Sequence, residues 1–168
     1  GHSLQCLALL AKGTTESMAA VPLLAQIHEG IVWSNRDQRT LNDKAAALIF
    51  ELRAVTKKAL LVIADAYYCN AKFLTAIVNA GCHVISRVRD NASAYYLPEM
   101  PLEKKRGRPK KYGEKVVLAS FFDRPGLFTT VASQLYGEDG SVELRYYAVN
   151  LLWKPTKSLM RFILVVHP

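Results

Sequence analysis

The stretch from residue 60 to residue 92 constrains the fold more than any other part of the chain. It opens with "LLVIA", an apolar run from Leu60 to Ala64 typical of a strand covered on both faces. A helical stretch, "NAKFLTAIVNAG", follows, with Asn70 as its N-cap and Gly81 at its end. The next run, "CHVISRVRDNA", is strand-like again. This order predicts a βαβ unit with two parallel strands, and therefore an α/β fold class.

A second helix is expected just before this unit, over residues 40–59. Apolar residues there recur at helical spacing, and Thr40 with Asp43 has the form of a capping box. Further upstream, residues 3–12 are strand-like, and residues 19–30 form a second extended stretch that contains a proline. Together these segments make an α/β half.

The composition and pattern of the sequence change after Asn91. Residues 92–115 hold a run of basic residues and three prolines, without a regular period. From Val116 onward, short strand-like segments alternate with turns, over residues 116–122, 127–136, 142–153 and 161–168. The sequence therefore predicts an α/β half followed by a β-rich half.

Composition narrows the class of protein. A chain of 168 residues, 51% hydrophobic, has room for one or at most two domains with a real core. The net charge of +8 favours a polyanionic partner. Its cysteines are far apart and form no metal-binding pair, which indicates a reducing, intracellular compartment. No apolar run is long enough to cross a membrane. Because the chain does not start with Met, we expect it to be cut from a longer parent.

Asp65 is the sharpest single candidate for chemistry. It stands at the end of the apolar strand, just before the turn into a helix. In open α/β sheets, ligands bind at the carboxyl ends of the strands, and a carboxylate there suits a hard cation such as Mg²⁺. The structural alternative is that Asp65 caps the following helix or pairs with Arg87 or Arg89.

Arg87 and Arg89 lie two residues apart on the predicted neighbouring strand. Their side chains should therefore point to the same face of the sheet. They could hold a phosphate backbone near Asp65. The alternative is a solvated or ion-paired end of a strand.

The run "KKRGRPKKYG", residues 104–113, carries six positive charges and no negative one. Its basic residues are Lys104, Lys105, Arg106, Arg108, Lys110 and Lys111. The core "RGRP" resembles an AT-hook, whose arginines lie along a narrow A·T-rich minor groove. The alternatives are a solvated basic loop, or phosphate contacts that ignore sequence.

Other kinds of site find little support. Three tyrosine pairs could stack on nucleic-acid bases or simply belong to the core: Tyr67-Tyr68, Tyr95-Tyr96 and Tyr146-Tyr147. The four histidines lack metal-ligand spacing. No nucleophile motif, Walker loop or dinucleotide-binding fingerprint is present.

Four motifs taken together, "GHSLQ", "LVIADAYY", "GCHVISRVRDNA" and "RGRPKKYG", resemble the DDE transposases of bacterial insertion sequences. The branch concerned has a β-rich insertion in its catalytic core, and the best-matched part runs from about Leu60 to Gly113. The resemblance implies a ribonuclease-H-like core fragment, with a mixed sheet, over residues 1–91. Residues 92–158 would form the basic loop and insertion, and residues 159–168 a strand that returns to the core.

The resemblance also implies chemistry. Transposases of this kind hold two divalent ions, Mg²⁺ or Mn²⁺, on a D, D, E triad and cut and rejoin DNA by in-line displacement at phosphorus. Asp65 matches the second Asp. The first Asp would precede this chain, and the Glu, on a helix with a Tyr-x₂-Arg-x₃-Glu-x₆-Lys pattern, would follow Pro168. We therefore expect the chain to be inactive alone.

The implied partners are transposon ends and target DNA, on which the protein would assemble as a dimer in the bacterial cytoplasm. Two alternatives remain. The chain could be a non-enzymatic DNA-binding module that uses the RGRP loop, or part of another metal-dependent nuclease of the same fold.

Overall fold

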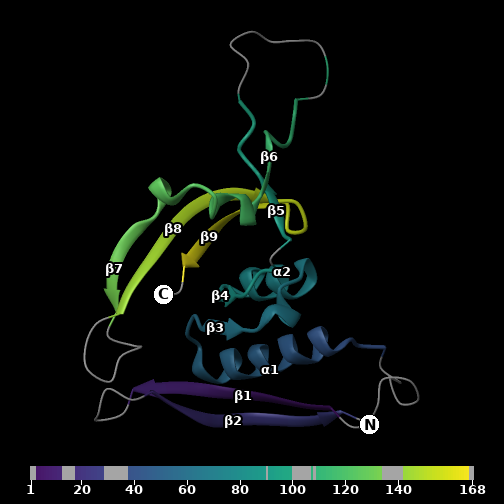
Figure 1. Ribbon diagram of the computed structural model, residues 1–168. Coiled ribbons are helices and arrows are strands. Elements are labelled where there is room, and N and C mark those ends of the chain that lie inside the picture. Colours follow the sequence, from purple (N-terminus) through teal and green to yellow (C-terminus); the bar gives the residue numbers. More distant parts are fainter. Residues whose placement is uncertain are drawn as a thin grey trace. The chain divides into compact units, whose positions relative to one another are not determined.

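The computed structural model of the protein describes residues 3–12, 18–28, 38–89, 91–99, 107, 109–133 and 142–166. The chain divides into two compact units, residues 1–87 and residues 88–168 (Figure 1). We call them unit 1 and unit 2 and describe each by itself. Among the described residues, no helix has the length and apolar character that crossing a membrane requires.

Unit 1 begins with an antiparallel pair of strands, β1 (Ser3–Lys12) and β2 (Met18–His28). The pairing slips between Leu7 and Ala8, so that Ala8 lies opposite Pro22. A proline cannot donate a hydrogen bond to a neighbouring strand, and such an irregularity in the register is a place where a sheet tolerates it. Both predicted extended stretches are confirmed.

The helix α1 (Leu41–Thr56) follows, with the predicted capping box at its start. The Thr40 side chain accepts a hydrogen bond from the backbone N–H of Asp43, and the Asp43 carboxylate accepts one from the backbone N–H of Thr40. These contacts satisfy N–H groups that have no partner within the helix. In Figure 1, α1 lies between the β1–β2 hairpin and the rest of unit 1.

The predicted βαβ unit is present. It consists of β3 (Leu61–Ala64), the short 3₁₀ helix η1 (Ala66–Tyr68), α2 (Ala71–Asn79) and β4 (His83–Ser86). The strands β3 and β4 pair in parallel, as predicted. The Asn70 side chain caps α2 by accepting the backbone N–H of Phe73 at 3.0 Å, and Gly81 after the helix adopts φ 73°, which suits glycine.

Three expectations about this unit need correction. The strand β3 is not covered on both faces: Val62 is 8% exposed, whereas Leu61 and Ile63 are 60% and 61% exposed. Within the described residues, the hairpin and the β3–β4 pair are separate two-stranded sheets rather than one mixed sheet. The second strand ends at Ser86, because its partner β3 ends at Ala64 and offers no further hydrogen bonds. The ribonuclease-H-like arrangement therefore stays a prediction.

Unit 2 is built on one antiparallel sheet around the long strand β8 (Val142–Trp153). β8 pairs with β7 (Thr129–Ser133), with β9 (Ser158–Val166), and through Leu152 with β5 (Ser93–Tyr95). β5 pairs in turn with β6 (Lys115–Val117). Figure 1 shows β7, β8 and β9 as a curved ribbon, and the β-rich half predicted from the sequence is confirmed.

One face of this sheet carries the core of unit 2. Leu151 is fully buried, and Phe162 and Leu164 of β9 are 7% exposed. The predicted strand over residues 116–122 is mostly wrong, because after β6 the chain turns into the 3₁₀ helix η2 (Leu118–Phe121). This turn buries both Leu118 and Phe121. In an extended strand the two side chains would point to opposite faces of the sheet. A second short turn, η3 (Pro125–Leu127), leads to β7.

The boundary between the two units in the sequence falls between Arg87 and Val88. It lies close to the predicted end of the core fragment at residue 91. β9, which includes most of residues 159–168, is hydrogen-bonded to β8 in unit 2. The predicted limits of core, insertion and returning strand stay predictions.

Candidate functional site

The carboxyl ends of β3 and β4 bring Asp65 and Ser86 together. Asp65 directly follows β3 and is exposed to solvent. Its backbone carbonyl accepts a hydrogen bond from the Ser86 hydroxyl at 2.8 Å, at the end of β4. The candidate carboxylate thus stands at the sheet edge where ligands of α/β proteins bind.

Asp65 also has the structural role that we considered as the alternative. Its Oδ1 accepts the backbone N–H of Tyr67 at 3.0 Å and so caps the short helix η1. In the described part of the chain this is the one hydrogen bond of its carboxylate, and Asp65 forms no ion pair with Arg87. The cap uses one carboxylate oxygen, so it does not prevent Oδ2 from binding another ligand.

Arg87 and Arg89 are both exposed, and both lie beyond the end of β4. Side chains alternate between two faces only within a strand, so the prediction that these two point to one face of the sheet does not hold beyond the end of β4. The backbone carbonyl of Arg89 instead accepts the N–H of Ala92 at 3.0 Å, as the chain turns toward β5. Their role in DNA binding stays a prediction.

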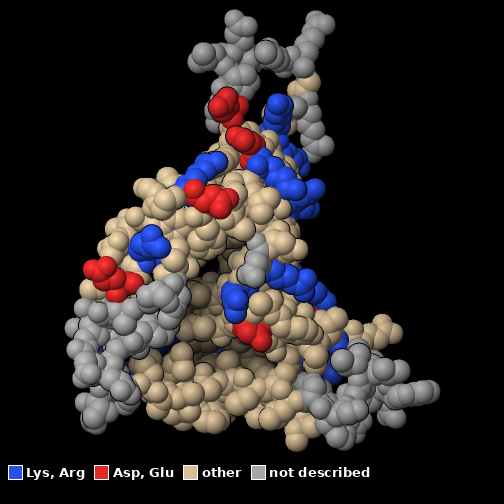
Figure 2. All heavy atoms as spheres, viewed as in Figure 1, with Lys and Arg blue, Asp and Glu red and all other residues tan. Residues whose placement is uncertain are grey.

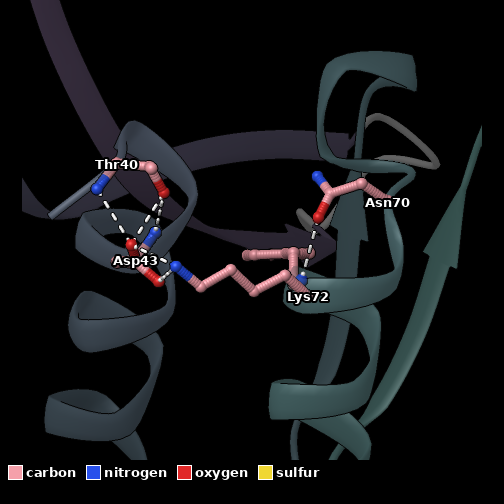
Figure 3. Close-up of polar contacts among 5 residues, drawn as sticks. Thr40, Asp43, Asn70 and Lys72 are labelled. Atoms are coloured by element: carbon pink, nitrogen blue, oxygen red, sulfur yellow. Dashed lines mark hydrogen bonds and ion pairs between the residues drawn. The ribbon is translucent and has the colours of Figure 1, made fainter.

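The N-terminal ends of α1 and α2 are joined by an ion pair (Figure 3). Nζ of Lys72 lies 2.7 Å from the carboxylate oxygens of Asp43. The hydrogen bond from Lys72, and then those from Thr40, lower the pKa of Asp43 from 3.8 to about 2. The pair holds the two helix starts together, and Asn70 caps α2 beside it.

A buried glutamine, which the sequence reasoning missed, connects the hairpin to the turn after Asp65. Gln5 of β1 is 7% exposed, and its Nε2 donates to the backbone carbonyl of Leu41 at 2.8 Å and to the Tyr68 hydroxyl at 3.1 Å. The signal was present in the sequence, because Gln5 is a polar residue inside an apolar strand. Buried polar side chains are hydrogen-bonded, so such a residue predicts a specific partner.

Four of the six basic residues in the run are not described by the structure. Lys104, Lys105, Arg106 and Arg108 lie outside the described residues, whereas Lys110 and Lys111 are described and exposed. Gly107 has φ 125°, a conformation that residues with a side chain rarely adopt. Glycine therefore has a backbone reason to stand between the two arginines of "RGRP".

The end of the basic run is fixed to β5. The backbone N–H of Gly113 donates to the carbonyl of Tyr96 at 2.9 Å, and a Cβ at Gly113 would lie 2.6 Å from the carbonyl oxygen of Leu97. The rings of Tyr95 and Tyr112 are 5.0 Å apart. We call β5 and β6, together with Tyr96, Leu97, Tyr112 and Gly113, the stem. Figure 2 shows basic side chains gathered around the stem, with acidic ones among them.

A complete metal site is not formed by the described residues. They contain no group of three or more His, Cys, Asp or Glu side chains placed to hold an ion. Burial raises the pKa of the Cys69 thiol next to Ser86, which makes it a poor metal ligand and nucleophile. Asp65 has the oxygen chemistry and the exposure that a hard cation needs, and it stands directly after β3, at the carboxyl end of the strand.

Residues 15–148 match a family model described as DDE superfamily endonuclease. The match covers well over half of the chain and includes β2, the whole βαβ unit, the basic run and most of the β-rich half. No curated protein matches the chain, and no solved structure does.

Proposed function

This chain belongs to the DDE superfamily endonucleases, and on that premise we propose that it is part of the catalytic domain of a bacterial insertion-sequence transposase. Endonucleases of this family act on DNA and generally use divalent metal ions. The proposed reaction is cleavage of DNA strands at transposon ends and their transfer to a target.

One observation supports this proposal most. A carboxylate, Asp65, stands exposed directly after a parallel strand, beside the end of the neighbouring strand. The family match covers this segment. We infer that Asp65 is the second Asp of the D, D, E triad.

Asp65 fits as one ligand of Mg²⁺ or Mn²⁺, because both ions prefer carboxylate oxygen. A single carboxylate does not make a magnesium site, so we propose that the other two acidic ligands, the first Asp and the Glu of the triad, lie outside these 168 residues. When bound, the ions would activate a water or 3′-hydroxyl and stabilise the leaving oxygen at phosphorus. The part of this chain is to hold one carboxylate at a fixed place and to bind the DNA around it.

DNA binding is the proposed role of the positive charges. The chain carries a net charge of +8, and Lys110 and Lys111 are exposed beside the stem. Basic side chains that neutralise phosphates release counterions, which gives affinity without sequence preference. We propose that the basic run contacts the DNA backbone or the minor groove, with Arg87 and Arg89 as further phosphate contacts.

A second candidate function is supported by the cap at Asp65. If its carboxylate only holds η1, the chain is a DNA-binding module without catalysis. The two candidates differ in what happens when the charge of Asp65 is removed.

The experiment is Asp65→Asn in the complete protein, with Asp123→Asn as the matched control. Asp123 is also exposed, and it lies in the turn of unit 2 after η2. Asparagine can still accept the Tyr67 N–H but carries no charge for a cation. We expect Asp65→Asn to abolish strand cleavage and to leave DNA binding unchanged, whereas Asp123→Asn cleaves normally. Full cleavage by Asp65→Asn would show that Asp65 only caps η1 and that this chain contributes DNA binding rather than a catalytic carboxylate to the complete protein.

The 168-residue chain alone gives a complementary result. It should show no cleavage with Mg²⁺ or Mn²⁺, because we propose that the first Asp and the Glu of the triad lie outside these 168 residues. Metal-dependent nicking by this chain, lost on Asp65→Asn, would show that its own acidic residues complete the site.

A further inference from the structure

The turn that carries Asp65 has little stability of its own. η1 has three residues, and its backbone hydrogen bonds, Tyr68 N–H to Asp65 and Cys69 N–H to Ala66, are both 3.2 Å long. Short 3₁₀ turns have poorer hydrogen-bond geometry than α-helices. The position of the Asp65 carboxylate therefore depends on contacts from the rest of unit 1.

Tyr68 contacts both α2 and β1 from within this turn. Its ring lies 5.2 Å from the ring of Phe73, which is 2% exposed in α2, and 5.2 Å from that of Tyr67. Its hydroxyl accepts the hydrogen bond from Nε2 of Gln5. The ring fixes the turn against α2, and the hydroxyl fixes it against β1.

The side chain of Gln5 is itself fixed by two hydrogen bonds. Both N–H groups of its amide are used, one for the Tyr68 hydroxyl and one for the Leu41 carbonyl at the start of α1. The side chain is buried, and a buried amide left without hydrogen-bond partners is costly, so the folded protein strongly favours keeping both bonds. Gln5 thus links β1, α1 and η1, three segments that are distant in the sequence.

We propose that Gln5 is a positioning residue for Asp65, acting through the Tyr68 hydroxyl on the turn that holds the carboxylate. This inference rests on the proposed function of Asp65. Metal ligands must be held within roughly 0.5 Å of their productive place, which a three-residue turn does not secure by itself. Ser86 holds the backbone of Asp65 from β4, and Gln5 holds the far end of the same turn.

The test uses Gln5→Met and Tyr68→Phe in the complete protein, with Gln26→Met as the matched control. Gln26 lies opposite Gln5 on β2 and is exposed, so the same chemical change there leaves the network intact. We expect the first two variants to raise the Mg²⁺ concentration for half-maximal cleavage by about 10- to 100-fold, the range typical when a group that orients a metal ligand is lost. DNA affinity should not change. The double variant should do no more than the worse single variant, because both break one link.

A second readout needs neither metal nor DNA. The backbone N–H of Tyr67 is bonded to Asp65 Oδ1, so its hydrogen exchange reports whether the carboxylate is in place. Exchange should become faster in Gln5→Met and Tyr68→Phe, and stay unchanged in Gln26→Met. Tyr68→Phe keeps the ring and its packing, so it remains informative if Gln5→Met does not fold.

The outcomes separate this inference from the proposed function. If Asp65→Asn abolishes cleavage while Gln5→Met and Tyr68→Phe keep the wild-type Mg²⁺ dependence and Tyr67 exchange, the positioning role is wrong and the proposed function stands. If Asp65→Asn cleaves normally, both are wrong. A lower melting temperature with parallel loss of DNA affinity, and no change in Mg²⁺ dependence, would show that Gln5 is only structural.

Discussion

The two units hold their distant segments together in different ways. In unit 1, side-chain hydrogen bonds join residues far apart in the sequence, such as Gln5 with Tyr68 and Ser86 with Asp65. In the described part of unit 2, side-chain hydrogen bonds join residues two or three apart, such as Ser120 with Val117. The long-range side-chain contacts in the described part of unit 2 include ring pairs: the ring centroids of Tyr147 and Phe121 are 5.3 Å apart.

This difference matches what each unit is proposed to do. Hydrogen bonds are directional, so a network of them can fix a carboxylate at one place. Ring packing and burial are much less directional, and they stabilise a sheet without fixing any one polar group. On the proposed function, unit 1 positions Asp65, and unit 2 supports the stem and the basic run.

The largest expected effect concerns the core of unit 2. Phe121 is 1% exposed and contacts the ring of Tyr147, so Phe121→Ala should cost about 3–5 kcal/mol of unfolding free energy. Urea denaturation measures this loss. Phe122→Ala is the matched control. The neighbouring residue Phe122 is 47% exposed, so its substitution should cost much less unfolding free energy. Equal losses at the two positions would contradict the assignment of the core.

The next effect concerns DNA. Replacing the six basic residues of the run by glutamine should flatten the slope of log K against log[salt] by up to about 5, since each phosphate contact contributes about −0.9. Binding titrations at several salt concentrations measure the slope. An unchanged slope would leave the run without a role in binding.

A charge-preserving variant tests the minor-groove interpretation separately. Arg106→Lys with Arg108→Lys keeps the charge and should keep the salt slope. Any preference for A·T-rich DNA should disappear, because it depends on arginine in the narrow groove. The same preference in wild type and variant would favour simple phosphate contact.

A smaller effect is expected at the start of α2. Asn70→Ala removes the side chain that accepts the Phe73 N–H, and loss of an N-cap typically costs about 1 kcal/mol. Asn70→Asp should restore most of this free energy, because Asp also caps helices well. Thermal unfolding of the three proteins measures both changes, and an Asp variant as unstable as the Ala variant would contradict the cap.

The smallest effect is the pH dependence of the Asp43–Lys72 pair. The folded protein lowers the pKa of Asp43 from 3.8 to about 2, so the pair stabilises the fold above the higher value. That stability is lost as the pH falls through about 2. The difference in melting temperature between wild type and Asp43→Asn should therefore shrink over this range. Because Lys72 is exposed, added salt should weaken the effect, and a difference independent of pH would contradict it.

The sequence predicted those parts of the fold that depend on local patterns. The capping box at Thr40, the cap at Asn70 and the strand over residues 142–153 lie where their residues indicated. The parallel pairing of β3 and β4 followed from the order strand, helix, strand. These features rest on interactions between near neighbours, which one sequence contains in full.

The parts that could not be predicted depend on partners distant in the sequence. The early end of β4 follows from where β3 ends, and the turn of η2 follows from the burial of Phe121. The bond from Gln5 to Tyr68 spans 63 residues, and nothing in either local pattern names the other. The sequence indicated Asp65 by its place after a strand, but the contacts that hold it came from the structure.

The most direct test of the account asks whether a metal ion touches Asp65. In Asp65→Cys, assayed in the complete protein, a thiolate replaces the carboxylate, and Mg²⁺ prefers oxygen whereas softer ions such as Mn²⁺ or Zn²⁺ accept sulfur more readily. We predict that this variant binds DNA normally, fails to cleave it with Mg²⁺, and regains part of its cleavage with a softer ion. Wild-type cleavage by Asp65→Cys in Mg²⁺ would contradict the account, because it would show that no catalytic ion depends on this side chain.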